Sequence, residues 1–247
     1  MSPLKRISCI NALTLKVLAM VFMFMDHLWA TLIPGANWLT MVGRLAFPIF
    51  AFQIVEGYFH TRDFKKYMTR LLLFALVSEI PFNLMMGGSL FYPFGQNVMV
   101  TFLEALLLVR LLDRCRQKSK KLFYVMIPVT FLLGNVLGLV TMVDYYGFGI
   151  MTVLVFYLTH DWKWGWLVQL AGLYVINVGL MGGMDIPVEL LGHTLFISQQ
   201  GLALLALIPI WLYNGKQGPH SKAIQYACYA FYPLHILVLS LLALAGF

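Results

Sequence analysis

The chain has 247 residues, of which 61% are hydrophobic and only 11% charged, and its mean hydropathy is +0.82. Soluble globular domains carry about 25% charged residues, and one of this length could not bury so much apolar surface, so the composition excludes that class. We expect an integral membrane protein that forms one domain over residues 1–247. The three cysteines lie far apart without a CxxC spacing, which predicts neither a disulfide framework nor a metal site.

Nine apolar segments follow one another along the chain, and each is long enough for a membrane helix or close to it. They predict an all-α, polytopic transmembrane bundle of about nine spans. The expected helices cover residues 12–33, 39–58, 67–86, 96–113, 122–142, 146–160, 164–182, 194–213 and 224–245.

Among the connections between these segments, only alternate ones contain Lys or Arg. One set comprises the N-terminus with Lys5 and Arg6, "HTRDFKK", "DRCRQKSKK", the connection with Lys163, and "NGKQGPHSK". The other set, "PGANWLT", "GGSLFYPFG", the residues around Asp144 and "GGMDIPVELLGH", contains neither residue type. The positive-inside rule then predicts a cytoplasmic N-terminus and an external C-terminus. Because topology accounts for the net charge of +7, we do not expect nucleic acid as a partner.

The first segment carries an acid and an imidazole inside an apolar run, "MVFMFMDHLWATLIP". An ionised Asp at a helix centre costs about 2.5–3.5 kcal/mol on insertion scales, so Asp26, His27 and the following Arg44 form a candidate catalytic site. A neutral His27 can act as a general base, while Asp26 and Arg44 set its orientation and the local field. Consecutive side chains diverge by about 100° on a helix, so either His27 or Arg44 can be the partner of Asp26.

Further polar residues lie at two predicted depths. Lys16 shares a helix face with His27, eleven residues away, and the two are separated by about 16 Å along that face. The outer group consists of Glu79, Asn83, Asn97, Glu104 and Asp144, and the cytoplasmic group of Lys16, Glu56 and Arg70. Each also has a structural interpretation: lysine or arginine snorkelling, an ion pair of Glu56, or hydrogen bonds between helices for the asparagines. His235, among aromatic residues, is more readily a packing residue.

The nucleophile motif GxSxG, the nucleotide-binding P-loop and the zinc-binding motif HExxH are absent from the sequence. A histidine base without a covalent intermediate fits direct transfer of an activated group to an amine or hydroxyl. The spacing alone leaves a proton-coupled carrier open, because it would use similar residues.

The chain contains the stretches "LKVLAMVFMFMDHLWATLIP", "GRLAFPIFAFQIVEGYFHTRDFKKYMTRLLLFALVSEIPFNLM", "QNVMVTF", "DYYGFGIMTVLVFYL" and "ALIPIWLYNGKQG" with "YAFYPLHILVL". The resemblance that they carry runs in order over nearly the whole chain and is to the TraX family, whose name-giving member acetylates conjugative F-type pilin. It implies a multi-pass enzyme of the bacterial inner membrane that moves acetyl from acetyl-CoA to the N-terminal amine of a small membrane protein. The family is also similar to broader membrane acyltransferases, in which a histidine and an arginine near the outer face serve transfer; His27 and Arg44 match them.

On this interpretation acetyl-CoA is a co-substrate and no metal is needed. The phosphates of acetyl-CoA would be held by Arg62, Lys65, Lys66 and Arg70. Its pantetheine arm would lie along the stripe from Lys16 to His27, and Glu56 is the remaining residue of the expected donor set. A peptide or lipid-linked acceptor, within the membrane lipids, would meet Glu79, Asn83, Asn97 and Asp144. Two other classes of function compete with acetyl transfer: a proton-coupled transporter or flippase of a small polar or lipid-linked substrate, and a non-enzymatic assembly factor for membrane polypeptides.

Overall fold

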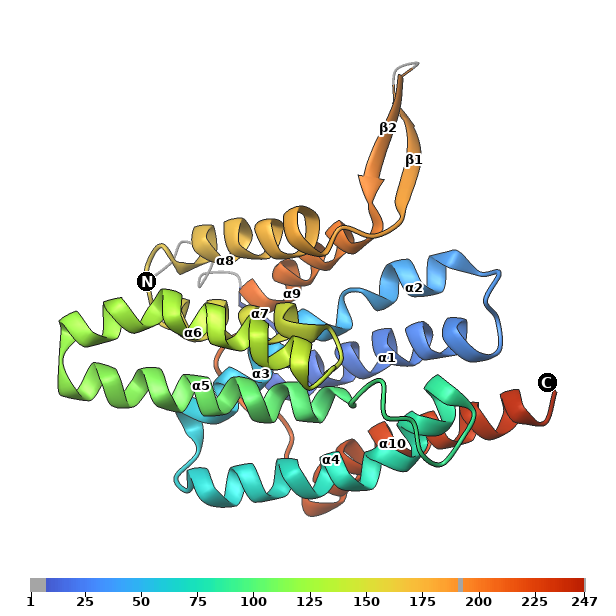
Figure 1. Ribbon diagram of the computed structural model, residues 1–247, viewed down its shortest axis with the longest axis horizontal. Coiled ribbons are helices and arrows are strands. Elements are labelled where there is room, and N and C mark those ends of the chain that lie inside the picture. Colours follow the sequence, from blue (N-terminus) through green and yellow to red (C-terminus); the bar gives the residue numbers. More distant parts are fainter. Residues whose placement is uncertain (1–7, 191–192, 247) are drawn as a thin grey trace. The chain divides into compact units, whose positions relative to one another are not determined.

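A computed structural model describes residues 8–190 and 193–246 of the chain (Figure 1). The described residues form two compact units, and neither unit is continuous in sequence. The first unit combines the chain up to Phe50 with Thr159–Pro219, and the second combines Ala51–Leu158 with the chain from His220 onward. That the whole chain acts as one domain stays a prediction.

The first unit contains two stretches of helix that meet around a central 3-10 segment. Helices α1 (Ala12–Thr31) and α2 (Asn37–Gly43) pack against each other, and α3 (Ala46–His60) begins here and ends in the second unit. The later stretch comprises α8 (Gly165–Tyr174), the π-helix η2 (Val175–Met181), the 3-10 helix η3 (Gln199–Ala206) and α9 (Leu207–Trp211). Segment η3 contacts α2, α8, η2 and α9, so it joins the two stretches.

The helix predicted for residues 39–58 is interrupted between α2 and α3, at Arg44 and Leu45. Pro48 explains the break, because a proline has no N–H to donate and its ring clashes with the carbonyl four residues earlier, here that of Arg44. The Leu45 N–H instead donates to the Val42 carbonyl at 3.1 Å, which closes a tighter turn. Arg44 therefore occupies a helix C-cap at an interruption, where its side chain can meet several elements.

A β-hairpin follows η2, and its position shows that the prediction of helix from residue 194 was wrong. Strand β1 (Asp185–Leu190) pairs antiparallel with β2 (His193–Ser198), in a register that places Pro187 opposite Phe196. The hairpin extends away from η2 and η3 (Figure 1). The sequence of β2, "HTLFIS", is a short apolar run that is followed closely by the apolar residues of η3, and the periodicity of such a run does not distinguish a strand from a helix. The helical part of the prediction holds only from Gln199 onward.

The second unit is built from longer helices: the rest of α3, α4 (Phe64–Gly87), α5 (Val98–Lys118), α6 (Lys120–Val140), most of α7 (Tyr146–Thr159) and α10 (Lys222–Leu244). Helices α5 and α6 form a hairpin, and α4 packs against both α5 and α10 (Figure 1). Gly134 and Gly138 allow α6 to lie close to α7, because an added Cβ would come within 2.8 Å of Ile150 and within 2.5 Å of Gly147.

The prediction of a helical membrane protein is confirmed at the level of its elements. Within the described residues, five helices are long and apolar enough to cross a membrane: Ala12–Thr31, Asn37–His60, Phe64–Gly87, Lys120–Val140 and Lys222–Leu244. Shorter apolar helices cover Tyr146–Thr159, Gly165–Met181 and Gln199–Trp211. The count of nine spans and the orientation stay predictions, and Lys5 and Arg6, on which the orientation partly depends, lie outside the described residues.

Candidate functional site

An ion pair between Arg44 and Asp26 lies at the centre of the first unit. The Arg44 Nη2 donates to the Asp26 Oδ1 at 2.5 Å, and both side chains are about four-fifths buried, with 21% and 19% exposed. The structure thus identifies Arg44 as a partner of Asp26, one of the two alternatives that the sequence leaves open. A buried pair of this kind is expensive to break, because the remaining charge is left uncompensated.

Gly43 is the reason that α1 and α2 approach closely enough for this contact. A Cβ at Gly43 would lie 2.5 Å from the Asp26 Cβ and 2.7 Å from its Oδ1, distances that real Cβ atoms essentially never show. The residue next to Arg44 therefore has to lack a side chain for the carboxylate to reach the guanidinium. Gly43 thus provides the space for Asp26, and Arg44 provides the charge that Asp26 contacts.

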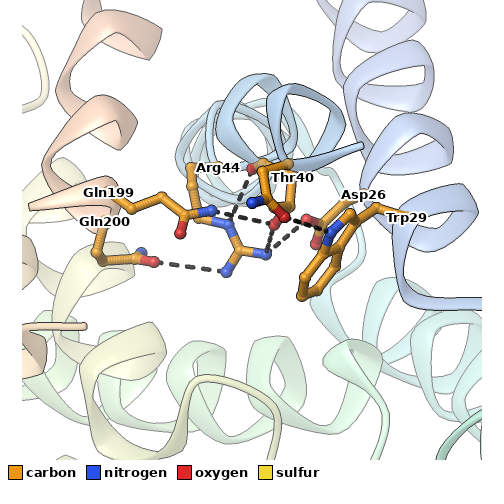
Figure 2. A network of polar contacts seen from close by, with 7 residues as sticks. Asp26, Trp29, Thr40, Arg44, Gln199 and Gln200 are labelled. Atoms are coloured by element: carbon orange, nitrogen blue, oxygen red, sulfur yellow. Dashed lines mark hydrogen bonds and ion pairs between the residues drawn. The ribbon is translucent and has the colours of Figure 1, made fainter. Parts of the chain in front are cut away.

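Thr40, one helical turn before Arg44, holds the guanidinium from the side. The Arg44 Nη2 donates to the Thr40 hydroxyl at 2.9 Å and the Nε to the Thr40 carbonyl at 3.3 Å. The Gln199 Nε2 donates to the same hydroxyl at 3.4 Å. Figure 2 shows the guanidinium between this group and Gln200. Thr40 and Gln199 are buried, so their contacts are sheltered from solvent.

A second line of contacts leads from the other side of Arg44 into η2. The Arg44 Nη1 donates to the Gln200 Oε1 at 3.5 Å, the Gln200 Nε2 donates to the Asn177 Oδ1 at 3.0 Å, and the Asn177 Nδ2 donates to the Leu173 carbonyl at 2.8 Å. Gln200 is 7% exposed and Asn177 only 4%. Asn177 lies in a π-helical turn, a local form that is frequent at functional sites.

His27 and Lys16, the other two first-unit candidates, both lie on α1 and are half-buried. The main-chain carbonyl of His27 accepts a hydrogen bond from the Thr31 hydroxyl at 2.7 Å. Their shared helix confirms the predicted secondary structure of this stripe, and the roles as base and as donor contact stay predictions.

The residues predicted to bind the acceptor substrate lie in the second unit, and two of them, Asn97 and Glu79, are joined by a hydrogen bond. The Asn97 Nδ2 donates to the Glu79 Oε2 at 2.5 Å and to the Ala75 carbonyl at 2.9 Å, and its Oδ1 caps α5 by accepting from the Met99 N–H. Asn97 thus has a structural function that links α4 to α5. Asn83 instead donates to the Leu90 carbonyl at 3.1 Å.

The remaining second-unit acids lie near the start of α7 and on α5. Asp144 precedes α7, and its carbonyl accepts from the Thr101 hydroxyl at 2.9 Å. Glu104 accepts from the Thr141 hydroxyl at 3.3 Å, which connects α5 with the end of α6. The part of Asp144 in binding the acceptor substrate stays a prediction.

The basic candidates gather at the start of α4. All four are exposed: Arg62, Lys65, Lys66 and Arg70. Arg70 lies on the helix as predicted, whereas Lys65 and Lys66 lie on the helix rather than in the predicted connection. Asp63 caps the helix by accepting from the Lys66 N–H at 3.0 Å, and this hydrogen bond lowers the pKa of Asp63 below its ordinary value. Glu56 lies on α3 with its carboxylate 3.9 Å from the His60 Nδ1.

Four residues of the Arg44 network were not predicted from the sequence: Thr40, Asn177, Gln199 and Gln200. A signal was available, because "VINVGL" and "SQQGLALL" each place amide side chains inside an apolar stretch, where polar groups need a partner. Which partner they meet could not be read from spacing, since Gln200 is 156 positions from Arg44. In the described part of the chain, no three His, Cys, Asp or Glu side chains are grouped to hold a metal ion.

Comparison with known proteins gives two findings. Residues 12–243 match the family model described as TraX protein. The chain is also 30% identical over 242 residues to a protein of Dichelobacter nodosus named "Probable fimbrial assembly protein FimC, serogroup H1", an alignment that covers 93% of this chain and 94% of the relative. No solved structure matches the chain.

Proposed function

The chain belongs to the TraX family, and from that membership we propose that it is an acetyltransferase of the bacterial inner membrane. It takes acetyl from cytoplasmic acetyl-CoA and transfers it to an amine or hydroxyl at the outer half of the membrane. The preferred acceptor is the N-terminal amine of a small, pilin-like membrane protein. The name of the Dichelobacter nodosus relative, a fimbrial assembly protein, supports an acceptor of this class.

The observation that carries the proposal is the ion pair between Asp26 and Arg44, in which Asp26 directly precedes His27 on α1. Helix packing alone needs only weak polar contacts, whereas this unit holds a carboxylate, a guanidinium and an imidazole within one short stretch. Arg44 is held on one side by Asp26 and Thr40 and on the other by Gln200. A cation fixed in advance in this way can stabilise negative charge that develops during a reaction, without reorganising at that moment.

In the proposed reaction, the acceptor nitrogen attacks the carbonyl carbon of the thioester and forms the new C–N bond. The carbonyl electrons move to the oxygen, whose negative charge is stabilised by the Arg44 cation, while His27 takes the proton from the nitrogen. The C–S bond then breaks as the carbonyl re-forms, and the thiolate takes the proton from the imidazolium to leave as the CoA thiol.

The basic residues at the start of α4 are proposed to bind the phosphates of acetyl-CoA. Lys16 and Glu56, near the predicted cytoplasmic side, are proposed to contact the rest of the donor. This donor set is Lys16, Glu56, Arg62, Lys65, Lys66 and Arg70. The acceptor set is Glu79, Asn83, Asn97 and Asp144. The four basic residues at the start of α4 are exposed, which agrees with phosphate binding and equally with a role in membrane topology alone. A measurement of acetyl-CoA binding separates these two roles.

The test is transfer of a labelled acetyl group from acetyl-CoA to membranes prepared from cells that lack the gene. Wild-type protein should label a membrane component, and His27→Ala should lower the rate by about 100- to 10,000-fold while acetyl-CoA still binds. His27→Gln should not restore transfer, because an amide keeps the hydrogen bonds but cannot take a proton at neutral pH. Arg44→Lys should also fail, since an ammonium cannot replace the planar contacts of the guanidinium.

Near-normal transfer by His27→Gln would contradict the assignment of His27 as base and would direct the search to Glu56 or Glu79. If no preparation transfers acetyl from acetyl-CoA and the protein instead moves a solute together with protons, it is a carrier. Mass spectrometry of membrane proteins and lipids, with and without the gene, identifies the acceptor by the lost acetyl group.

A further inference from the structure

We infer that Gln200 and Asn177 are positioning residues that fix the Arg44 guanidinium through a relay of hydrogen bonds anchored in η2. The inference deepens the proposed function and rests on it for its catalytic consequence. The relay runs from Arg44 through the Gln200 side chain to Asn177 and ends at the Leu173 carbonyl.

The relay is directional, because each amide has one oxygen and one nitrogen and both are used. The Gln200 oxygen faces the cation and its nitrogen faces the Asn177 oxygen, which turns the Asn177 nitrogen toward the Leu173 carbonyl. Reversing either amide would place two acceptors or two donors against each other. Both side chains are more than nine-tenths buried, so water cannot readily replace a lost contact.

The relay and the ion pair hold Arg44 from opposite sides (Figure 2). Asp26 on α1 supplies a strong contact at 2.5 Å, while Gln200 on η3 supplies a longer one at 3.5 Å. Without Gln200, the guanidinium would lose this contact on the side opposite Asp26. A displacement of about 1 Å in an active site can lower a rate by about 100-fold, so even a weak opposing contact matters for the position of the cation.

The π-helical turn gives the relay its anchor. In η2 the turns are wider than in an α-helix, and Asn177 is the third residue of this element, which begins at Val175. Its nitrogen donates to the Leu173 carbonyl, four residues earlier on α8. The side chain thereby ties itself to the end of α8 and presents its oxygen to η3. This arrangement gives the distorted turn a function: it holds one acceptor in place for Gln200.

The test compares Gln200→Glu with the matched control Gln169→Glu. The substituted side chain keeps the shape of glutamine, but an ionised carboxylate cannot donate to Asn177 and attracts the Arg44 cation more strongly than the amide oxygen does. Gln169 is a buried glutamine of the same unit that also donates and accepts, with Thr159 at 3.0 Å and Trp211 at 2.8 Å, and it lies outside the relay. The control therefore measures the cost of the same buried substitution without touching Arg44.

Acetyl transfer to membranes of cells lacking the gene is measured at varied acetyl-CoA. Gln200→Glu should lower the rate at saturating acetyl-CoA by at least about 10-fold, and up to about 100-fold, with the KM for acetyl-CoA unchanged. Gln169→Glu should keep the rate within about 2-fold of wild type. Equal rates for Gln200→Glu and Gln169→Glu, or a change in KM alone, would overturn the inference.

A measurement without turnover keeps this result apart from failure of the proposed function. The shift in thermal midpoint is determined for Gln200→Met, Asn177→Leu and the double variant, in detergent micelles. If the two residues form one relay, the double variant should lose much less than the sum of the single variants. Additive shifts would refute the relay even if the wild type transfers acetyl, whereas a non-additive cycle with an inactive wild type would refute only the reaction.

Discussion

Gly43→Ala is the smallest change that separates Asp26 from Arg44 without altering either charge. The new Cβ would lie 2.5 Å from the Asp26 Cβ, whereas ordinary contacts begin at 3.4 Å, so α1 and α2 must move apart locally by about 0.9 Å. Rotation of the carboxylate alone cannot relieve the clash, because the Asp26 Cβ is itself one of the atoms involved. The ion pair should lengthen from 2.5 Å to about 3.4 Å.

The energetic consequence can be estimated from this displacement. With an effective dielectric constant of about 20, the attraction between unit charges falls by about 2 kcal/mol over that change in distance. Overpacking itself costs about 1–3 kcal/mol, and the higher helix propensity of alanine returns up to about 1 kcal/mol. Unfolding should therefore become easier by only a few kcal/mol, while the displaced Arg44 should lower acetyl transfer by up to about 100-fold.

The assay measures thermal unfolding in detergent and acetyl transfer on the same preparations. Gly35→Ala is the matched control, because it lies in the connection between α1 and α2 and an added Cβ there meets nothing within 4 Å. It should leave both properties near wild type. Wild-type transfer by a folded Gly43→Ala protein would refute the argument that the distance between Asp26 and Arg44 matters for the reaction.

Three further predictions concern other parts of the chain. A topology reporter at Gln117 should be active only in the cytoplasm and one at the C-terminus only outside; activity on the same face would refute the nine-span topology. Joint replacement of the α4 cations should weaken acetyl-CoA binding, less so at high salt, and unchanged affinity would assign them to topology alone. The replaced residues are Arg62, Lys65 and Lys66. The hydrogen bond from the Lys66 N–H lowers the pKa of Asp63, so the contribution of this cap to stability is full at neutral pH and is lost as the pH falls below about 4. The unfolding temperature of Asp63→Asn should therefore depend less on pH in that range than the unfolding temperature of wild type.

The sequence was sufficient for the class of fold, because membrane helices are long apolar segments and are read almost directly from hydropathy. It was also sufficient to select Asp26 and Arg44, because an ionised side chain inside a membrane helix costs free energy and is usually paired or functional. The break at Arg44 was predictable in principle from Pro48 and was missed because the apolar run continues through it. The hairpin at Asp185–Ser198 was hidden for the same reason, as hydrophobicity alone does not distinguish a short strand from a helix end.

The hydrogen-bond relay from Arg44 to Asn177 could not be predicted from sequence patterns. Helix periodicity relates residues a few positions apart, and it explains why Thr40 lies beside Arg44. It does not relate positions 44 and 200, which meet only because η3 packs against α2. The orientation of each amide then depends on the next one, so the network is defined by tertiary structure and not by a motif.

The short separation between Asp26 and Arg44 has a consequence for biogenesis. Their positions differ by 18, whereas Gln200 lies 156 positions beyond Arg44, so the two opposite charges leave the ribosome long before η3 is synthesised. Entering a bilayer singly, each would cost about 2.5–3.5 kcal/mol, but as a helical pair they can neutralise one another at once. We therefore expect a nascent chain truncated after α3 to insert normally, and Asp26→Ala to impair that insertion; glycosylation mapping of the two truncated chains would measure it, and equal insertion would argue against early pairing. The ion pair with Asp26 that positions Arg44 in the folded protein would then also lower the cost of inserting Arg44 into the membrane during synthesis.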